Sequence, residues 1–218
     1  MSRSPNHGDR RGGLRPELVV IHYTAMPDAA SAMRALCDPA REVSAHWLIA
    51  RDGTVTALVD EERRAWHAGE GAWAGRGDVN SRSVGIELDN DGASPFAAPL
   101  MDALETLLEG ILSRWSIPCE GVIGHSDMAP GRKRDPGPRF DWRRLARSGL
   151  AVWPAALPDA PDNAPVDADV FRRQAQSFGY PPMDDALLLR TFRLRFRPGA
   201  RGPLDAIDCA LAAGLVRD

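Results

Sequence analysis

The sequence predicts an α/β protein with a mixed central β-sheet flanked by helices, followed by a small three-helix C-terminal domain. Short apolar, β-branched runs are intermixed with amphipathic helical patterns between residues 17 and 150, which is typical of a mixed α/β sheet. A stretch rich in Pro, Ala and Asp follows at 151–167 and has the composition of a linker. We therefore expect a disordered arm at 1–16, a main domain at 17–150, a linker at 151–167 and a small helical domain at 168–218.

The strands of the main domain are predicted from short apolar runs. A hairpin is expected between residues 46–51 and 54–59, because Asp52 and Gly53 suit a type I′ turn between two strands. The other predicted strands are 17–22 (ELVVIH), 83–88 (SVGIEL) and 121–124 (GVIG).

The helices are predicted from apolar spacing and end signals. Asp28 is a suitable N-cap for a helix over 28–38, and Pro99 suits the first turn of a long helix that ends before Pro118. We expect loops in the Gly-rich stretch 66–80 and in the Pro/Gly-rich stretch 125–142, with a short helix after the second. Three further helical patterns lie at 170–180, 184–196 and 202–216. Five arginines between residues 190 and 201 are expected to form a partly solvated stripe that contacts anionic wall fragments or packs against the main domain.

Composition narrows the class of protein. The 218 residues include 27 basic and 30 acidic side chains, a net charge of −3, which argues against a nucleic-acid binder driven by bulk charge. No apolar window is long enough for a transmembrane helix, and the polar N-terminus lacks the apolar core of a secretory signal. We expect a cytoplasmic monomer. The three widely spread cysteines fit reduced thiols.

Four polar residues are the candidates for chemistry. His22, Glu87 and His125 lie at or directly after three separate predicted strands, and Asp135 follows ten residues later in a Pro-rich loop. A single sheet would bring the strand ends to one edge, and two His with one carboxylate form a ligand set for a catalytic zinc. The spacing matches no short zinc signature, so surface or hydrogen-bonded histidines stay open as the alternative.

Lys133 is the single lysine among the basic residues of the chain. The other 26 basic residues are arginines, so the chain has a strong bias towards arginine. A single lysine within such a bias either marks a position where an ammonium group is required or arises by chance.

Five blocks occur along the chain in this order: VVIHYT, VSAHWLIARDGTV, AWHAGEGAW, NSRSVGIELDNDG and GHSDMAPGRKRDPGPRFDW. Together they resemble the zinc-dependent N-acetylmuramoyl-L-alanine amidases of the AmpD/AmiD type, whose fold is shared with the peptidoglycan recognition proteins. The resemblance covers about residues 15–150, and the C-terminal helices are similar to the peptidoglycan-binding-like domain of AmiD-type members.

The resemblance implies roles for individual residues. His22, His125 and Asp135 would bind Zn²⁺, Glu87 would be the catalytic glutamate, and Lys133 the catalytic lysine. The implied reaction is hydrolysis of the amide between N-acetylmuramic acid and L-alanine in muropeptides, including anhydro-muropeptides of cell-wall recycling. Two alternatives stay open, namely a non-catalytic peptidoglycan-binding module and a zinc amidohydrolase that acts on another amide.

Three further residues are weaker candidates for substrate contact. His67 would lie beside the cleft or simply hold its loop, and Trp73 would stack on substrate or anchor the loop by packing. Arg132 would pair with a substrate carboxylate or belong to a solvated basic loop.

Overall fold

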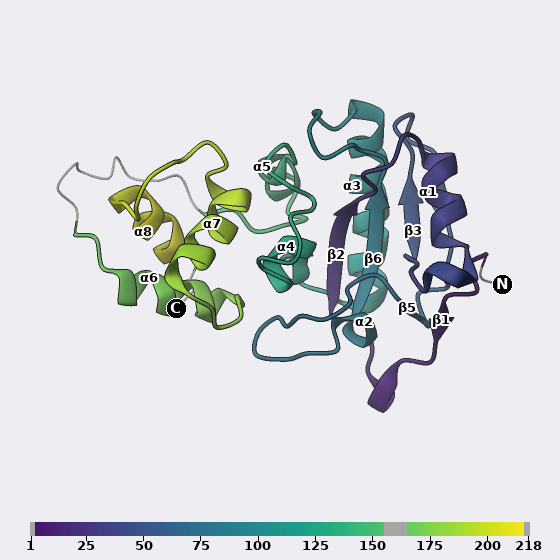
Figure 1. Ribbon diagram of the computed structural model, residues 1–218, viewed down its shortest axis with the longest axis horizontal. Helices are drawn as coiled ribbons and strands as arrows, with labels where there is room; N and C mark the ends of the chain where they lie inside the picture. The colour runs from purple at the N-terminus through teal and green to yellow at the C-terminus, as the bar shows by residue number, and fades with distance from the viewer. Residues whose placement is uncertain (1–2, 155–164, 216–218) are drawn as a thin grey trace.

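The computed structural model describes residues 3–154 and 165–215, and its main domain is built around a five-stranded sheet. In Figure 1 this sheet lies in the right half of the view, and the C-terminal helices lie on the left. The strand order is β4-β3-β6-β2-β7; β4 is antiparallel to β3, and the other neighbours are parallel. This confirms the mixed sheet. Its strands are β2 (Leu18–Tyr23), β3 (Trp47–Ile49), β4 (Val55–Ala57), β6 (Ser83–Leu88) and β7 (Val122–Gly124).

Both faces of the central strands are covered, which explains why their sequences are almost continuously apolar. Val19 and Ile21 of β2 pack on the side of α3 (Ala98–Trp115), in one hydrophobic core. Val20 belongs to a second core, which contains side chains of the C-terminal helices. Because successive side chains of a strand alternate, His22 lies on the same face as Val20.

The two longer helices of the main domain, α1 and α3, lie where their local end signals predict them. The Asp28 side chain accepts a hydrogen bond of 2.7 Å from the Ser31 amide and caps α1 (Ala29–Leu36). α3 (Ala98–Trp115) carries a proline in its first turn and ends at Ser116, whose φ of 54° is left-handed. The expected hairpin is confirmed by the antiparallel pairing of β3 with β4.

Two one-turn helices lie where the sequence predicts loops. α2 (Val79–Arg82) ends the Gly-rich stretch, and α4 (His125–Met128) begins directly after β7. His125 therefore starts a helix and does not end a strand. Four residues are too few to show helical periodicity, so neither turn is visible in the sequence. The short helix expected after the second loop is α5 (Trp142–Arg147).

The expected disordered arm is wrong for residues 3–16. β1 (His7–Gly8) pairs antiparallel with β5 (Arg64–Ala65). Ser4 and Asn6 are buried, and their side chains donate hydrogen bonds to main-chain carbonyls in and after α1. Single polar contacts of this kind hold the segment, and they leave no apolar pattern from which sequence reasoning can predict order.

Three helices follow the main domain and confirm the predicted small helical unit. Parts of the flanking segments, residues 155–164 of the expected linker and 216–218 of the expected domain, lie outside the described residues. Phe171, Phe192 and Leu211 of these helices share a hydrophobic core with Val20 and Ile123 of the sheet, so the unit packs on the main domain. No helix in the described ranges has the length and apolar character needed to cross a bilayer. The helices are α6 (Ala168–Phe178), α7 (Asp185–Phe196) and α8 (Ala206–Ala213).

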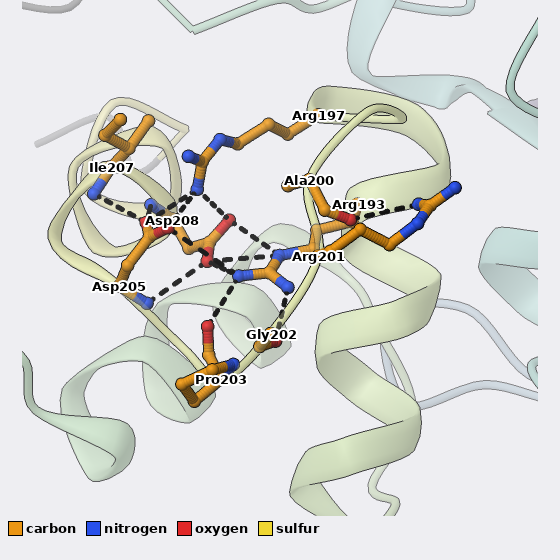
Figure 2. Close-up of polar contacts among 9 residues, drawn as sticks. All are labelled: Arg193, Arg197, Ala200, Arg201, Gly202, Pro203, Asp205, Ile207 and Asp208. Carbon is orange, nitrogen blue, oxygen red and sulfur yellow. Dashed lines mark hydrogen bonds and ion pairs between the residues drawn. The ribbon is translucent and has the colours of Figure 1, made fainter.

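A buried carboxylate ties α7 to α8 and to the loop between them (Figure 2). Asp208 is fully buried and accepts hydrogen bonds from the guanidinium groups of Arg193 and Arg197. Arg193 also donates to the carbonyls of Gly202 and Pro203, at 2.7 and 2.8 Å. These arginines of the predicted stripe thus serve the internal packing of the unit.

A second buried ion pair joins the helical unit to α4. Asp127 accepts hydrogen bonds from the Tyr180 hydroxyl and from Nη1 of Arg195, each at 2.9 Å. The Arg195 guanidinium lies over the Trp142 ring, 4.0 Å from its centroid. The helix turn that begins with His125 is therefore held from behind by residues of the C-terminal helices.

We predict that Arg10→Met destabilises the protein by about 1–3 kcal/mol, because it leaves buried carbonyls without their donor. The Arg10 guanidinium donates to the carbonyls of Glu61 (2.7 Å), Ser81 (2.9 Å) and Ser83 (3.0 Å). Urea unfolding measures the change. Arg11→Met is the matched control, because Arg11 is an exposed neighbour whose side chain makes none of these bonds. Equal midpoints for both variants would contradict the prediction.

Candidate metal centre and its pocket

His22, Asp135 and His125 meet at the carboxyl edge of the parallel strands. His22 lies near the end of β2, and His125 directly follows β7, the parallel neighbour of β2. The loop after α4 returns to this edge, where the Asp135 carbonyl accepts a hydrogen bond of 2.8 Å from the Ser126 amide. His22 Nδ1, His125 Nδ1 and Asp135 Oδ2 lie 2.9 Å from one another, and all three residues are buried.

The chemistry of these three atoms fits a metal ion. His125 Nε2 lies 2.9 Å from the Ala68 carbonyl, which only accepts, so Nε2 carries the proton and Nδ1 presents a lone pair. Burial, reinforced by nearby His125, lowers the pKa of His22 to about 4, so His22 is neutral at pH 7. Buried ligand atoms that converge in this way are well satisfied by a cation between them. His22, His125 and Asp135 can hold a metal, and two imidazoles with one carboxylate suit a catalytic zinc site with a position left for water.

Glu87 lies beside this cluster, because β6 pairs with β2 in the register that sets Glu87 against His22. Its Oε2 atom is buried and has no hydrogen-bond partner among the described residues. Burial raises the pKa of Glu87 well above its usual range; Asp135 acts in the same direction, and Lys133 opposes it. A carboxyl group with a raised pKa and a free oxygen can take up and release a proton.

Lys133 lines the same pocket, in the loop that also carries Asp135. The Lys133 amide donates a hydrogen bond of 3.0 Å to the Ala129 carbonyl, so the end of α4 holds its main chain. The Lys133 ammonium is near enough to lower the pKa of both His22 and Glu87. It places a positive charge at the site.

A pocket of about 450 Å³ contains these groups. His22, Glu87, His125, Lys133 and Asp135 all line it, so the structure brings together every residue for which the resemblance implies catalysis or metal binding. Sequence reasoning did not single out several lining residues, among them Tyr23, Arg41 and Val43. Tyr23 and Val43 lie within blocks that carry the resemblance, which is a signal that could have found them, whereas Arg41 lies outside every block. Further lining residues are Tyr23, Met26, Arg41, Val43, Trp66 and Arg134.

Two of the expected substrate contacts line the pocket but are bonded to the protein. His67 is 9 % exposed, and its ring nitrogens contact His22 Nε2 at 3.0 Å and Ser83 Oγ at 3.1 Å. The Arg132 guanidinium donates to the carbonyls of Ala68 and Glu70. Both side chains hold the Gly-rich loop against the site.

The expectation that Trp73 contacts substrate is wrong. Trp73 is 3 % exposed and does not line the pocket. Its ring makes edge-to-face contacts with Phe178 and Tyr180, at centroid distances of 5.5 and 5.3 Å. Gly179 passes so close that a Cβ there would lie 2.4 Å from the indole. The C-terminal helical unit therefore covers Trp73, and the aromatic side chain anchors the loop.

The fold and the site fit a metal-dependent hydrolase, and the comparisons with known proteins show which family it is. The family model described as Amidase_2, N-acetylmuramoyl-L-alanine amidase, matches residues 12–138. The chain is 34% identical to the Escherichia coli N-acetylmuramoyl-L-alanine amidase AmiD over 93% of its own length and 83% of that protein. It is also 34% identical to the 1,6-anhydro-N-acetylmuramyl-L-alanine amidase AmpD of Enterobacter cloacae, over 65% of this chain and 85% of AmpD. The chain belongs to the N-acetylmuramoyl-L-alanine amidase family, which is a family of enzymes.

Solved structures agree over almost the whole chain. The complex of E. coli AmiD with anhydro-N-acetylmuramic acid-L-Ala-D-gamma-Glu-L-Lys matches with a TM-score of 0.84, over 94% of this chain and 90% of AmiD. AmpDH3 from Pseudomonas aeruginosa matches with a TM-score of 0.82 and 34% identity, over 94% and 92% of the two chains. Because both matches extend beyond the main domain, the C-terminal helices belong to the shared architecture.

We predict a pH-dependent stability that arises in part from His46. His46 is fully buried: Nδ1 accepts from the Gly85 amide, and Nε2 donates to the Arg63 carbonyl. Burial lowers the pKa of His46 to about 3. The unfolded chain takes up a proton near pH ~6.5, and the native protein does not, so this stabilisation is complete above pH ~6.5 and is lost as the pH falls towards about 3.

Between pH ~6.5 and ~4.5, the free energy of unfolding should fall more steeply for wild type than for His46→Asn, by up to about 1.4 kcal/mol per pH unit. Urea unfolding with EDTA in every sample measures the two slopes without a contribution from bound metal. Parallel slopes would show that the native state does not exclude this proton.

Proposed function

We propose that the protein is a zinc enzyme that hydrolyses the amide between N-acetylmuramic acid and L-alanine in muropeptides. The observation that carries this proposal is the convergence of His22, His125 and Asp135 in one pocket with Glu87 and Lys133. The two structural relatives support the substrate class, since AmiD is complexed with an anhydro-muramyl tripeptide and AmpDH3 with an anhydromuramic pentapeptide.

The pocket chemistry suits such a substrate. Arg41, Arg132, Lys133 and Arg134 surround the cluster, so that cations outnumber the carboxylates of Glu87 and Asp135 on the pocket wall. Stem peptides of muropeptides carry carboxylates, which guanidinium groups recognise well. We infer that Arg41 and Arg134 contact the peptide, because the Arg132 guanidinium is bonded to main-chain carbonyls.

In the proposed mechanism, Glu87 transfers a proton and Lys133 stabilises a negative charge. When bound by His22, His125 and Asp135, zinc supplies Lewis-acid chemistry that lowers the pKa of water and polarises a carbonyl. Glu87 accepts the proton of the attacking water at its free oxygen as the new C–O bond forms. Lys133 stabilises the oxyanion of the tetrahedral intermediate. Glu87 then gives its proton to the alanine nitrogen as the C–N bond breaks, which returns the site to its starting state.

We further propose that the substrates are anhydro-muropeptide fragments of cell-wall recycling, in line with the ligands of the two relatives. Comparing hydrolysis of anhydro-muropeptides with that of intact murein tests this choice. The cytoplasmic location and the monomeric state stay predictions, and cell fractionation and sedimentation measure them.

The first test measures the metal and the product together. We predict about one zinc per chain, release of stem peptide from muropeptides, and loss of both product and metal after treatment with a chelator. Added Zn²⁺ should restore release. Muropeptide binding without product would favour a binding module instead, and bound zinc without action on muropeptides would favour an amidohydrolase for another amide.

The second test separates proton transfer from charge stabilisation. We predict that Glu87→Gln and Lys133→Arg each lower kcat by at least about 100-fold while zinc stays bound. Glutamine cannot carry the proton, and the guanidinium spreads the charge over a wider, planar fork. Glu109→Gln on the exposed side of α3 and Arg139→Lys are the matched controls. Near-normal turnover by either site variant would remove the role assigned to that residue.

A further inference from the structure

We propose that His67 is a positioning residue that fixes His22 in the tautomer needed for metal binding. This inference rests on the proposed metal site and adds a residue that does not touch the metal. The contacts form a single line of hydrogen bonds that runs from the main chain of α2 through Ser83 and His67 to His22.

Donor and acceptor roles along this line follow from its first member. Ser83 Oγ lies 2.6 Å from the Val79 carbonyl, which only accepts, so the Ser83 hydroxyl hydrogen points there. Ser83 Oγ is then the acceptor for His67 Nε2 at 3.1 Å, and this nitrogen carries the His67 proton. The His67 ring is buried, and its two nitrogens contact a hydroxyl oxygen and the His22 ring, neither of which is anionic, so the ring is neutral and Nδ1 has a lone pair.

The tautomer of His22 follows directly. His67 Nδ1 accepts at 3.0 Å from His22 Nε2, which must therefore carry the proton of the neutral His22 ring. The Nδ1 atom of His22 is left with a lone pair, directed at His125 Nδ1 and Asp135 Oδ2. A neutral histidine in the other tautomer would direct an N–H group at the cluster and could not bind a metal through Nδ1.

The surroundings hold His67 in this one place. Its ring lies against β6 at Gly85, where a Cβ would approach within 2.4 Å of His67 Cγ, so any other residue would push the ring away. The Asn80 side-chain oxygen accepts from the amides of His67 (3.0 Å) and Ala68 (2.8 Å). Ala68 in turn accepts from His125 Nε2. Two consecutive residues thus orient both imidazole ligands by their outer nitrogens.

Two substitutions of His67 separate the hydrogen bond from the packing. His67→Asn offers a side-chain oxygen close to the place of Nδ1, whereas His67→Phe keeps a ring but has no acceptor. Loss of a hydrogen-bond partner of a ligating histidine weakens metal binding by about 10–100-fold. We expect this loss of zinc affinity, measured by competition with a chelator, for His67→Phe, and a smaller loss for His67→Asn.

The control is His46→Asn, which alters another buried histidine whose ring lies 5.6 Å from that of His67. The His46 nitrogens bond to the Gly85 amide and the Arg63 carbonyl, and neither Gly85 nor Arg63 is a proposed metal ligand. This variant should change the unfolding midpoint and leave the zinc dissociation constant at the wild-type value. Urea unfolding of each apoprotein shows whether the variants fold.

The outcomes separate the two proposals. A wild-type protein that binds no zinc would overturn the proposed function. Zinc binding by wild type and equally tight binding by folded His67→Phe would overturn the positioning role alone. Should His67→Phe fail to fold, Ser83→Ala provides a second test, because it removes the acceptor for His67 Nε2 and leaves the His67 and His22 side chains in place. Unchanged zinc affinity in Ser83→Ala would count against the proposal.

Discussion

Parallel pairing of β2 with both β6 and β7 is the constraint on which the site depends. It sets Glu87 beside His22 and delivers the chain to His125 at the same edge, so three groups distant in sequence meet without any local motif. A slip of one residue would turn His22 to the face covered by α3 and abolish the cluster. The register is secured by the apolar residues of β2, which are buried on both faces of the sheet. The same packing that stabilises the sheet therefore fixes the donor geometry.

The C-terminal helices extend this constraint to the back of the site. Asp127, two residues after His125, accepts hydrogen bonds from Tyr180 and Arg195. The Trp73 ring of the Gly-rich loop packs against the same helical unit. A buried ion pair is weak evidence for stability, but it restricts orientation because neither charge has water as a substitute partner. The unit thus supports the α4 turn and the Gly-rich loop from behind, while the residues that line the pocket come from the main domain. Any contact it makes with peptidoglycan would come in addition to this structural role.

Periodic apolar patterns and local end signals made much of this molecule predictable. β6, α3 and the three C-terminal helices lie where such patterns predict them. The grouping of His22, Glu87 and His125 followed from their places at strand ends, whereas Asp135 was a candidate as a carboxylate in the loop ten residues after His125. Prediction failed where order or burial depends on a single contact between residues far apart in the sequence. Ser4 and Asn6 order the N-terminal segment through carbonyls of distant residues, and Trp73 is covered by helices that follow much later. Such contacts depend on tertiary geometry and leave no periodic trace.

The adjacent Arg132 and Lys133 explain why one lysine persists in an arginine-rich chain. Arg132 uses its planar fork to hold the carbonyls of Ala68 and Glu70, a task that needs several donors in fixed directions. Lys133 lines the pocket, where its charge opposes the rise in the pKa of Glu87 and adds to the lowering of the pKa of His22. A compact ammonium leaves room for substrate and concentrates its charge at one point. Neighbouring positions in one loop thus have different roles: the Arg132 guanidinium orders the loop, and the Lys133 ammonium is the group that the proposed mechanism uses to stabilise the oxyanion.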